Sequence, residues 1–152
     1  MAGTIVVGVD GSDPGRAALR WAIEEAKVRN AAVVAVHVWS FYPAVPPETF
    51  DGVPAPMTVP DAGEAIEADS RRLLDRELEA VSQEAAGVGV EARLVEGNAA
   101  EALTDASRDA DLLVVGTKGH GALAGALLGS VSQHLAHHPP CPLVLVPRRD
   151  ND

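Results

Sequence analysis

The sequence predicts an α/β domain in which a parallel sheet is covered by helices on both faces. Short apolar runs of strand length alternate along the chain with segments of helical periodicity, and such alternation is typical of parallel sheets. Apolar residues make up 47% of the 152, mostly Ala, Val and Leu, whereas aromatic residues make up only 3%. Small branched side chains suit parallel strands that are buried under Ala-rich helices. We expect residues 1–152 to form a single domain.

The amino-terminal part of the chain predicts a strand, a tight turn and a helix. The apolar run Thr4–Val9 is expected to be a buried strand, and it ends at the turn signal Asp10-Gly11-Ser12. Asp13 is predicted to cap the following helix, with Pro14 in the first helical position. The helical period then extends to residue 29.

A second buried strand, Ala32–Trp39, is followed by a segment of different composition. Five of the 11 prolines lie between Pro43 and Pro56, and Pro60 follows. We therefore expect residues 40–62 to form a variable loop of about twenty residues, longer than most loops in compact domains. A surface insertion is the simplest interpretation, and a lid or a partner surface is the alternative.

The second half of the chain continues the alternation of helices and strands. A long charged helix precedes a partly polar strand, whose polarity suggests a place near a sheet edge. Asn98 and Glu101 then match a capping box that opens a short helix. The predicted ranges, from the long helix to the last strand, are 63–86, 89–95, 98–108, 112–116, 130–137 and 143–146.

Net charge and composition exclude several classes of function. The formal net charge is −10, from 22 acidic and 12 basic residues, which argues against nucleic-acid binding and against an anionic membrane surface. No apolar run approaches the ~20 residues of a membrane span. Residues 1–10 lack the pattern of a signal peptide, so we expect a cytoplasmic protein. The single cysteine, Cys141, excludes a disulfide framework within the chain.

Two loops lie where a ligand site is expected. Ligands of open α/β sheets bind beyond the carboxyl ends of the strands, where the strand order reverses. One loop follows the first strand at Asp10–Ser12, and the other spans residues 116–132 after the fourth strand. Asp10 is predicted to contact the ligand, as an acceptor for ribose or as a metal ligand, although a plain turn residue is the alternative. Ser12 is interpreted as a turn or cap residue rather than a nucleophile.

The second loop has the features of a phosphate site. Gly116 and Gly119 would let the backbone approach a ligand closely. Gly129 precedes a helix, whose first N–H groups lack intrahelical acceptors and whose dipole favours an anion. Ser130 and Ser132 add hydroxyl groups that can donate to phosphate oxygens. Such local donors are what an acidic protein needs in order to hold phosphate.

These glycines and serines resemble a known signature. The spacing Gly-x2-Gly-x9-Gly-Ser over residues 116–130 is similar to the ATP-binding signature of the universal stress protein family. The resemblance extends over nearly the whole chain, with 40–62 as its variable part. It is carried further by Val7–Ser12, Asp111–Gly116, Gly129–His134 and Cys141–Val146.

The resemblance implies a Rossmann-like nucleotide-binding fold with five parallel strands in the order 3-2-1-4-5. It implies that the backbone near Val38 contacts adenine, that ATP is the ligand, and that Mg²⁺ is carried on its phosphates rather than by protein side chains. It also implies a homodimer formed through the last strand, 142–146. The predicted nucleotide-binding residues are Asp10, Gly11, Ser12, Val38, Gly116, Thr117, Gly119, His120, Gly129, Ser130, Val131 and Ser132.

We expect a nucleotide-dependent regulator or sensor of the stress response rather than a fast enzyme. Its signal would be nucleotide occupancy, which would order residues 117–129 and change contacts with a second copy or with a regulatory partner. A slow ATP hydrolase is the alternative from another class, with Lys118 and His120 as its only residues of suitable chemistry. A third interpretation keeps the fold but binds AMP or cyclic AMP. The chain lacks the Gly-x4-Gly-Lys-Ser/Thr sequence of P-loop enzymes.

Other conspicuous residues are expected to be structural. His37 lies in a buried strand, where a hydrogen-bonded core role is the simplest interpretation, and Cys141 lies next to proline. Trp21 and Trp39 are expected in or near the core, with Trp39 beside the predicted adenine pocket as the alternative. Three histidines near the last helix end could bind a metal, but a helix end favours histidine for electrostatic reasons alone. They are His134, His137 and His138.

Overall fold

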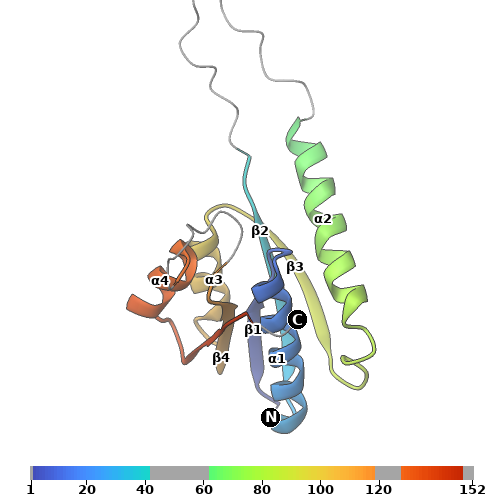
Figure 1. Cartoon of the computed structure of the whole chain (residues 1–152), viewed down its shortest axis with the longest axis vertical. Helices are drawn as coiled ribbons and strands as arrows, with labels where there is room; N and C mark the ends of the chain where they lie inside the picture. Colours follow the sequence, from blue (N-terminus) through green and yellow to red (C-terminus); the bar gives the residue numbers. More distant parts are fainter. Residues whose placement is uncertain (1, 42–61, 119–127, 149–152) are drawn as a thin grey trace, which may run out of the picture.

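The computed structural model describes residues 2–41, 62–118 and 128–148, and its strands form one parallel sheet in the order β3-β2-β1-β4-β5 (Figure 1). This order and the α/β class confirm the prediction from sequence. The elements are β1 (Thr4–Gly8), α1 (Asp13–Arg29), β2 (Ala32–Trp39), α2 (Ala62–Ala80), β3 (Val90–Glu96), α3 (Ala99–Ser107), β4 (Leu112–Gly116), α4 (Ser130–His137) and β5 (Leu143–Val146).

The strand order reverses between β1 and β4. From β1 the chain adds β2 and then β3 on one side, and it returns to add β4 and β5 on the other. Every pair of neighbouring strands is parallel, so all carboxyl ends lie along one edge of the sheet. The carboxyl ends of β1 and β4 are therefore the topological switch point of this sheet.

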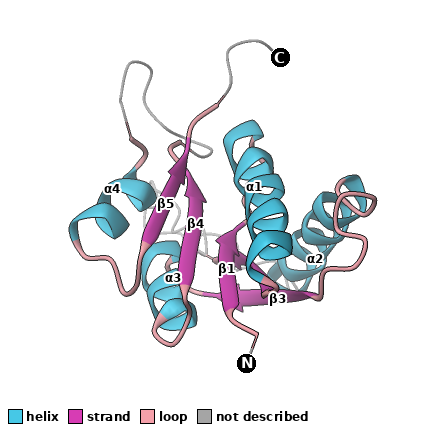
Figure 2. Cartoon of the chain, turned by 90° about the horizontal axis from the view of Figure 1, so that it is seen from below, coloured by secondary structure: helices cyan, strands magenta, loops and turns pink. Residues whose placement is uncertain are grey.

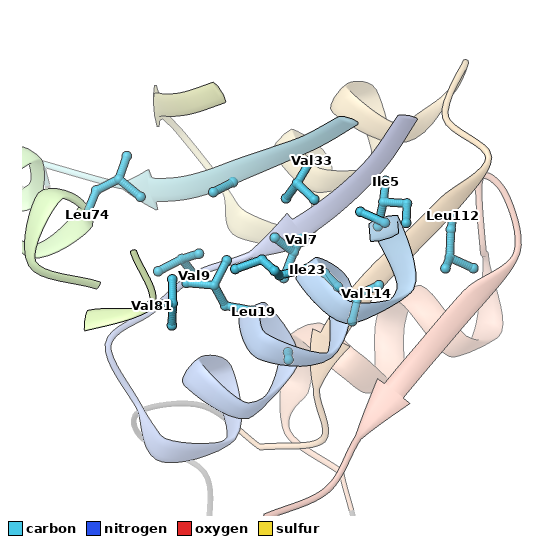
Figure 3. Close-up of a cluster of buried hydrophobic side chains, with 14 residues drawn as sticks. Ile5, Val7, Val9, Leu19, Ile23, Val33, Leu74, Val81, Leu112 and Val114 are labelled. Carbon is cyan, nitrogen blue, oxygen red and sulfur yellow. The ribbon is translucent and has the colours of Figure 1, made fainter. Parts of the chain in front are cut away.

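One face of the sheet is covered by α1 and α2 (Figure 2). Side chains alternate between the two faces of each strand, and one set from β1, β2 and β4 packs under these helices (Figure 3). The buried members of this cluster are Ile5, Val7, Val9, Ala18, Leu19, Ala22, Ile23, Ala26, Val33, Ala35, Leu74, Val81, Leu112 and Val114.

The other face is covered by α3 and α4 (Figure 2). The alternate residues of β1, β2 and β4 point to this side and form a second, smaller cluster. Its buried members are Val6, Val34, Val36, Leu103, Leu113, Val115 and Leu135. Because β1 and β4 are buried on both faces, they read as continuous apolar runs, whereas the partly polar β3 lies at the sheet edge as predicted.

An ion pair joins the two helices of the first face. Arg16 donates to both carboxylate oxygens of Glu77, from Nε at 2.9 Å and from Nη2 at 2.7 Å. Glu77 is buried in α2, so its charge requires this partner. The hydrogen bond to Glu77 raises the pKa of Arg16. The pair therefore anchors α2 beside the first turns of α1.

The start of α1 corrects one prediction. Ser12, not Asp13, is the N-cap: its backbone is extended, and its hydroxyl oxygen accepts from the N–H of Gly15 at 3.1 Å. Asp13 is the first residue of the helix. The prediction failed because both residue types are good caps, and the choice depends on which backbone stays extended after β1.

Other boundaries differ by smaller amounts. β1 ends at Gly8 rather than Val9, although the N–H of Val9 still donates to Val36 O at 2.8 Å. β3 is shifted by one residue, to Val90–Glu96. α2 begins at Ala62, not Gly63, and ends at Ala80 rather than residue 86, because the chain tightens there into turns with bonds such as Val81 N to Leu78 O at 3.2 Å.

Candidate functional site at the switch point

Asp10 follows β1 and organises the turn into α1. Its Oδ1 accepts from the backbone N–H of Ser12 at 2.9 Å and from the Ser12 hydroxyl at 2.5 Å. Gly11 between them has a φ of 82°, a left-handed conformation that favours glycine. No hydrogen bond within residues 2–41, 62–118 and 128–148 uses Asp10 Oδ2, and none of the side-chain oxygens in those ranges is both buried and unpaired. The second carboxylate oxygen is thus accessible to a ligand.

Gly15 is a site residue that the sequence analysis missed. A Cβ built on Gly15 would overlap Asp10 Oδ1 and would approach Ser12 Oγ to 3.2 Å. The absence of a side chain therefore lets the Asp10 carboxylate lie over the first turn of α1. The available signal was a glycine in the first turn of a helix, where glycine is otherwise unfavourable.

Gly116 brings the end of β4 against the start of α1. A Cβ on Gly116 would lie 2.8 Å from both the carbonyl carbon and the Cβ of Pro14. Both neighbours belong to a helix start with little freedom to move, so only glycine fits. The prediction that a ligand approaches Gly116 is untested, but contact with Pro14 alone explains why this residue is glycine.

Thr117 holds the end of β4 to the start of α4. Its carbonyl oxygen accepts from the N–H of Gly129 and from the hydroxyl of Ser132, each at 2.7 Å. Its own N–H donates to Val146 O at 3.0 Å. Three predicted site residues, far apart in sequence, are therefore in direct contact. Ser132 is 3% exposed, and its hydroxyl proton is directed to Thr117 rather than outward.

The first turn of α4 has backbone donors for which residues 2–41, 62–118 and 128–148 supply no backbone acceptor. Gly129 is the N-cap and provides no side-chain hydrogen bond. The first intrahelical bond runs from Gln133 N to Gly129 O at 2.9 Å. The N–H groups of Ser130, Val131 and Ser132 therefore have no helical acceptor, and no other backbone acceptor for them lies in the described ranges. Ser130 is exposed and Val131 is half-buried, whereas Gly129 and Ser132 are buried.

Val38 lies one residue before the end of β2, beyond the point where β1 stops pairing. The last bond between these strands joins Val9 N to Val36 O. The next acceptor along β1, Val9 O, instead contacts Nδ1 of the buried His37 at 2.6 Å. Among the residues described, the N–H and C=O of Val38 have no backbone partner on the β1 side. The prediction that His37 is a hydrogen-bonded core residue is confirmed.

Several predictions concern residues outside the described ranges. Gly119 and His120 of the glycine-rich loop and residues 42–61 of the proline-rich segment fall there. The capping box of α3 is confirmed in part, since Asn98 Oδ1 accepts from Glu101 N at 3.1 Å.

The structure also describes several of the other conspicuous side chains. Burial raises the pKa of the Cys141 thiol, and the charge of Asp111 raises it further, so this thiol stays protonated at neutral pH. Trp21 packs against the cluster under α1. No group of three His, Cys, Asp or Glu side chains in the described part could hold a metal. None of its helices is long and apolar enough to cross a membrane.

The fold and this arrangement define an α/β protein with a candidate ligand site at the switch point of a parallel sheet. The chain belongs to the universal stress protein family, whose profile matches residues 1–147. A universal stress protein of Mycobacterium tuberculosis is 35% identical over 150 residues, which cover 97% of this chain and 48% of that relative. The chain spans about half the length of the curated relatives it matches.

Solved structures share the fold. The universal stress protein UspA from Lactobacillus plantarum has a TM-score of 0.72 at 19% identity, covering 95% of this chain and 97% of its own. A universal stress protein solved in complex with cAMP has a TM-score of 0.68 at 27% identity, covering 97% of this chain and 98% of its own. The first likeness shows the fold alone, and the second is to a universal stress protein that was solved in complex with cAMP.

Proposed function

We propose that this chain binds an adenine nucleotide, ATP with Mg²⁺, across the carboxyl end of β1 and acts as a nucleotide-dependent regulator. The observation that carries the proposal is the start of α4, which has no side-chain cap and whose first three N–H groups have no backbone acceptor among the described residues. In a protein of net charge −10, an anion must be held by such local donors.

The phosphates are assigned to the N–H groups of Ser130, Val131 and Ser132 and to the hydroxyl of Ser130. These donors lie in the first turn of α4, at the positive end of its dipole. Ser132 contributes by its backbone, since its hydroxyl is bound to Thr117. The predicted contacts of Gly119 and His120 complete this end of the site.

The adenine is assigned to the open backbone of Val38, and the ribose to Asp10 Oδ2. Only β1 separates β2 from β4, which corresponds to about 10 Å at the usual strand spacing. A nucleotide lying across the end of β1 would reach from the backbone of Val38 to the start of α4. The solved relative in complex with cAMP supports an adenine ligand on this fold.

Mg²⁺ would bind through the phosphates. No described cluster of three acidic, histidine or cysteine side chains could hold the ion alone. Mg²⁺ commonly keeps several waters and takes its remaining ligands from substrate phosphates. The bound ion would offset part of the ligand's negative charge in this acidic protein.

We place the interface of a homodimer at β5, and nucleotide binding would be signalled by a change in the contacts of this dimer. Bonds from Leu113 N to Pro142 O and from Thr117 N to Val146 O show that even-numbered residues of β5 face β4. Leu143 and Leu145 therefore direct their N–H and C=O groups to the open edge. An antiparallel pairing that sets Leu143 opposite Leu145 of the partner subunit would satisfy all of them.

Leu145→Pro tests this dimer. Proline removes an N–H that faces the open edge but no bond to β4, so monomers are expected at concentrations where the wild type is dimeric. Leu145→Ala loses the same side-chain packing but keeps the N–H, and it should remain dimeric. Sedimentation velocity measures the outcome, and a dimeric Leu145→Pro variant would reject the β5 interface.

Cyclic AMP is the second candidate ligand, favoured by the solved relative that binds it. Isothermal titration with Mg·ATP, AMP and cyclic AMP distinguishes ATP from cyclic AMP as the preferred ligand. If the start of α4 holds the phosphate tail, Mg·ATP binds more tightly than AMP, and Ser130→Ala reduces that difference. Equal affinities for all three ligands would show that the start of α4 does not bind the phosphate tail.

A turnover assay with Mg·ATP separates the regulator from the slow hydrolase. We expect stoichiometric binding without rapid multiple turnover, whereas turnover that is lost with Lys118→Ala would favour the enzyme. Mass spectrometry of small molecules released from freshly purified protein identifies the ligand directly. We place the regulator in the bacterial cytoplasm, where ATP and a regulatory partner protein are available.

A further inference from the structure

The hydrogen-bonded pairing of β1 with β2 ends before β2 itself ends at Trp39. In the register of this pair Gly8 lies opposite Val36, and Val9 N donates to Val36 O at 2.8 Å. The next bond of a regular parallel ladder would run from Val38 N to Val9 O. That bond is not formed, although both residues are described.

A side chain takes the place of the missing ladder bond. Nδ1 of His37 lies 2.6 Å from Val9 O. A carbonyl oxygen can only accept, so this ring nitrogen carries the proton and donates. The ring belongs to the face of β2 that also carries Val33 and Ala35, because side chains alternate along the strand.

The backbone of Val38 is consequently left open toward the β1 side. Val36 faces β1 through its accepted bond, and Trp39 faces β3, since Trp39 O accepts from Gly97 N at 2.9 Å. Alternation then directs the N–H and C=O of Val38 toward the line of β1. One donor and one acceptor of a single residue thereby face the same side, beyond the end of β1, without a backbone partner among the described residues.

We propose that His37 is a positioning residue for base recognition: its hydrogen bond turns Val9 O toward the ring and out of line with the Val38 N–H, which stops the ladder and leaves the Val38 N–H and C=O for a base edge. This inference rests on the proposed nucleotide site. Adenine presents an amino donor next to the ring-nitrogen acceptor N1, which matches a backbone C=O beside an N–H. Guanine presents the opposite order, an oxygen acceptor beside an N–H donor, so this edge selects adenine over guanine.

Three substitutions at His37 distinguish the effect of its hydrogen-bond donor from the effect of its side-chain volume. His37→Asn places an amide N–H near the position of Nδ1, so it can still donate to Val9 O. His37→Gln moves the amide to the position of the other ring nitrogen, and His37→Leu has no donor. The Asn variant should resemble the wild type, whereas the Gln and Leu variants should let Val38 N–H pair with Val9 O.

Amide hydrogen exchange in nucleotide-free protein tests the ladder directly. Exchange at Val38 should slow by about tenfold or more in the Gln and Leu variants and stay unchanged in the Asn variant, because only the former gain a ladder bond. If His37→Leu fails to fold, the Asn and Gln pair carries the comparison. Unchanged exchange at Val38 in His37→Gln would overturn the inference.

Titration then tests the consequence for binding. The Gln and Leu variants should lose about tenfold or more in affinity for Mg·ATP, because two hydrogen bonds to the base are blocked. Their affinity for Mg·tripolyphosphate, which has no base, should stay unchanged. Slowed exchange with unchanged ATP affinity would reject base positioning by His37. If the wild type binds no adenine nucleotide, the proposed function fails, and hydrogen exchange still decides whether His37 stops the ladder.

Discussion

The helices α1 and α4 begin at the carboxyl ends of the neighbouring strands β1 and β4, yet their first turns differ. The start of α1 is closed by Ser12, whose hydroxyl oxygen accepts from Gly15 N, and by Asp10, which accepts from Ser12. The start of α4 has Gly129 as its N-cap, with no side-chain bond. Within the described part of the chain, the first turn of α1 is capped by its own side chains, whereas the first turn of α4 is not.

Charge reinforces this difference. Asp13 lies in the first turn of α1, beside Asp10, whereas the first turn of α4 contains no acidic residue. An anion would be repelled at the first helix start and stabilised at the second. The comparison teaches that two helix starts on the same edge of a sheet can differ in role: one builds the turn, and the other has the donors that the proposed phosphate would need.

The largest effect should follow from a change at the contact between the two regions. Gly116→Ala is expected to destabilise the protein by about 2 kcal/mol, because the added Cβ would press on the backbone of Pro14. Denaturant unfolding measures the loss. Gly89→Ala is the control, since it is also a glycine at a strand end and no described atom lies within 4 Å of its added Cβ. Equal stability of the two variants would contradict the close contact.

A side-chain cap introduced at the start of α4 should make this helix start resemble that of α1. Gly129→Asp adds a side-chain cap worth about 0.5 kcal/mol, but Gly129 is buried, so desolvation of the carboxylate offsets this gain and little net change in the stability of the nucleotide-free protein is expected. Its carboxylate would occupy the phosphate donors, so affinity for Mg·ATP should fall by about tenfold or more. Thermal unfolding and titration calorimetry measure the two effects.

Gly129→Ala is the matched control for that experiment. Gly129 has a φ of −74°, which any residue can adopt, so alanine adds a Cβ without a cap. A loss of ATP affinity equal to that of Gly129→Asp would show that space, not capping, is responsible. Full affinity in the Asp variant would place the phosphates elsewhere.

Removing the cap of α1 should affect stability first. Ser12→Ala is expected to cost about 1 kcal/mol, which lowers Tm by about 3 °C in a domain of this size. Ser12→Thr keeps the hydroxyl and should lose less. Differential scanning calorimetry of nucleotide-free protein provides the measurement, and an unchanged Tm in Ser12→Ala would show that the cap contributes nothing.

The smallest change in stability is expected from Ser130→Ala. This exposed hydroxyl caps nothing in the described structure, so stability should change by less than about 0.5 kcal/mol. Affinity for Mg·ATP should fall by about threefold to tenfold, the value of one hydrogen bond. Ser82→Ala, at an exposed site elsewhere, is the control and should leave the titration unchanged. An equal loss of affinity in both variants would show that the Ser130 hydroxyl does not contact the phosphate.

Much of the fold was predictable because its signals are local. The apolar runs at β1, β2 and β4, the edge character of β3 and the glycine before α4 all follow from composition and spacing within a few residues. The strand order needed the family resemblance. The cap of α1 was assigned to Asp13 instead of Ser12, because two suitable residues stand side by side and only the backbone conformation distinguishes them.

The site depends more on contacts between distant segments. The glycine pattern predicted which loop matters, but not that Pro14 fills the space beside Gly116 or that Thr117 holds Gly129 and Ser132. His37 was expected to be satisfied in the core, and its partner, Val9 O, was not foreseen. A single sequence carries no signal for a hydrogen bond between side chain and backbone 28 residues apart.

The amino-acid sequence by itself determined the class of fold, the positions of most elements and the helix start that lacks a cap, because periodicity, turn residues and missing side chains act over short distances. Only the tertiary structure decided which donors and acceptors remain free at the switch point. That outcome depends on the close approach of β1, β2, β4 and two helix starts, where each bond made within the protein removes a group that a ligand could use.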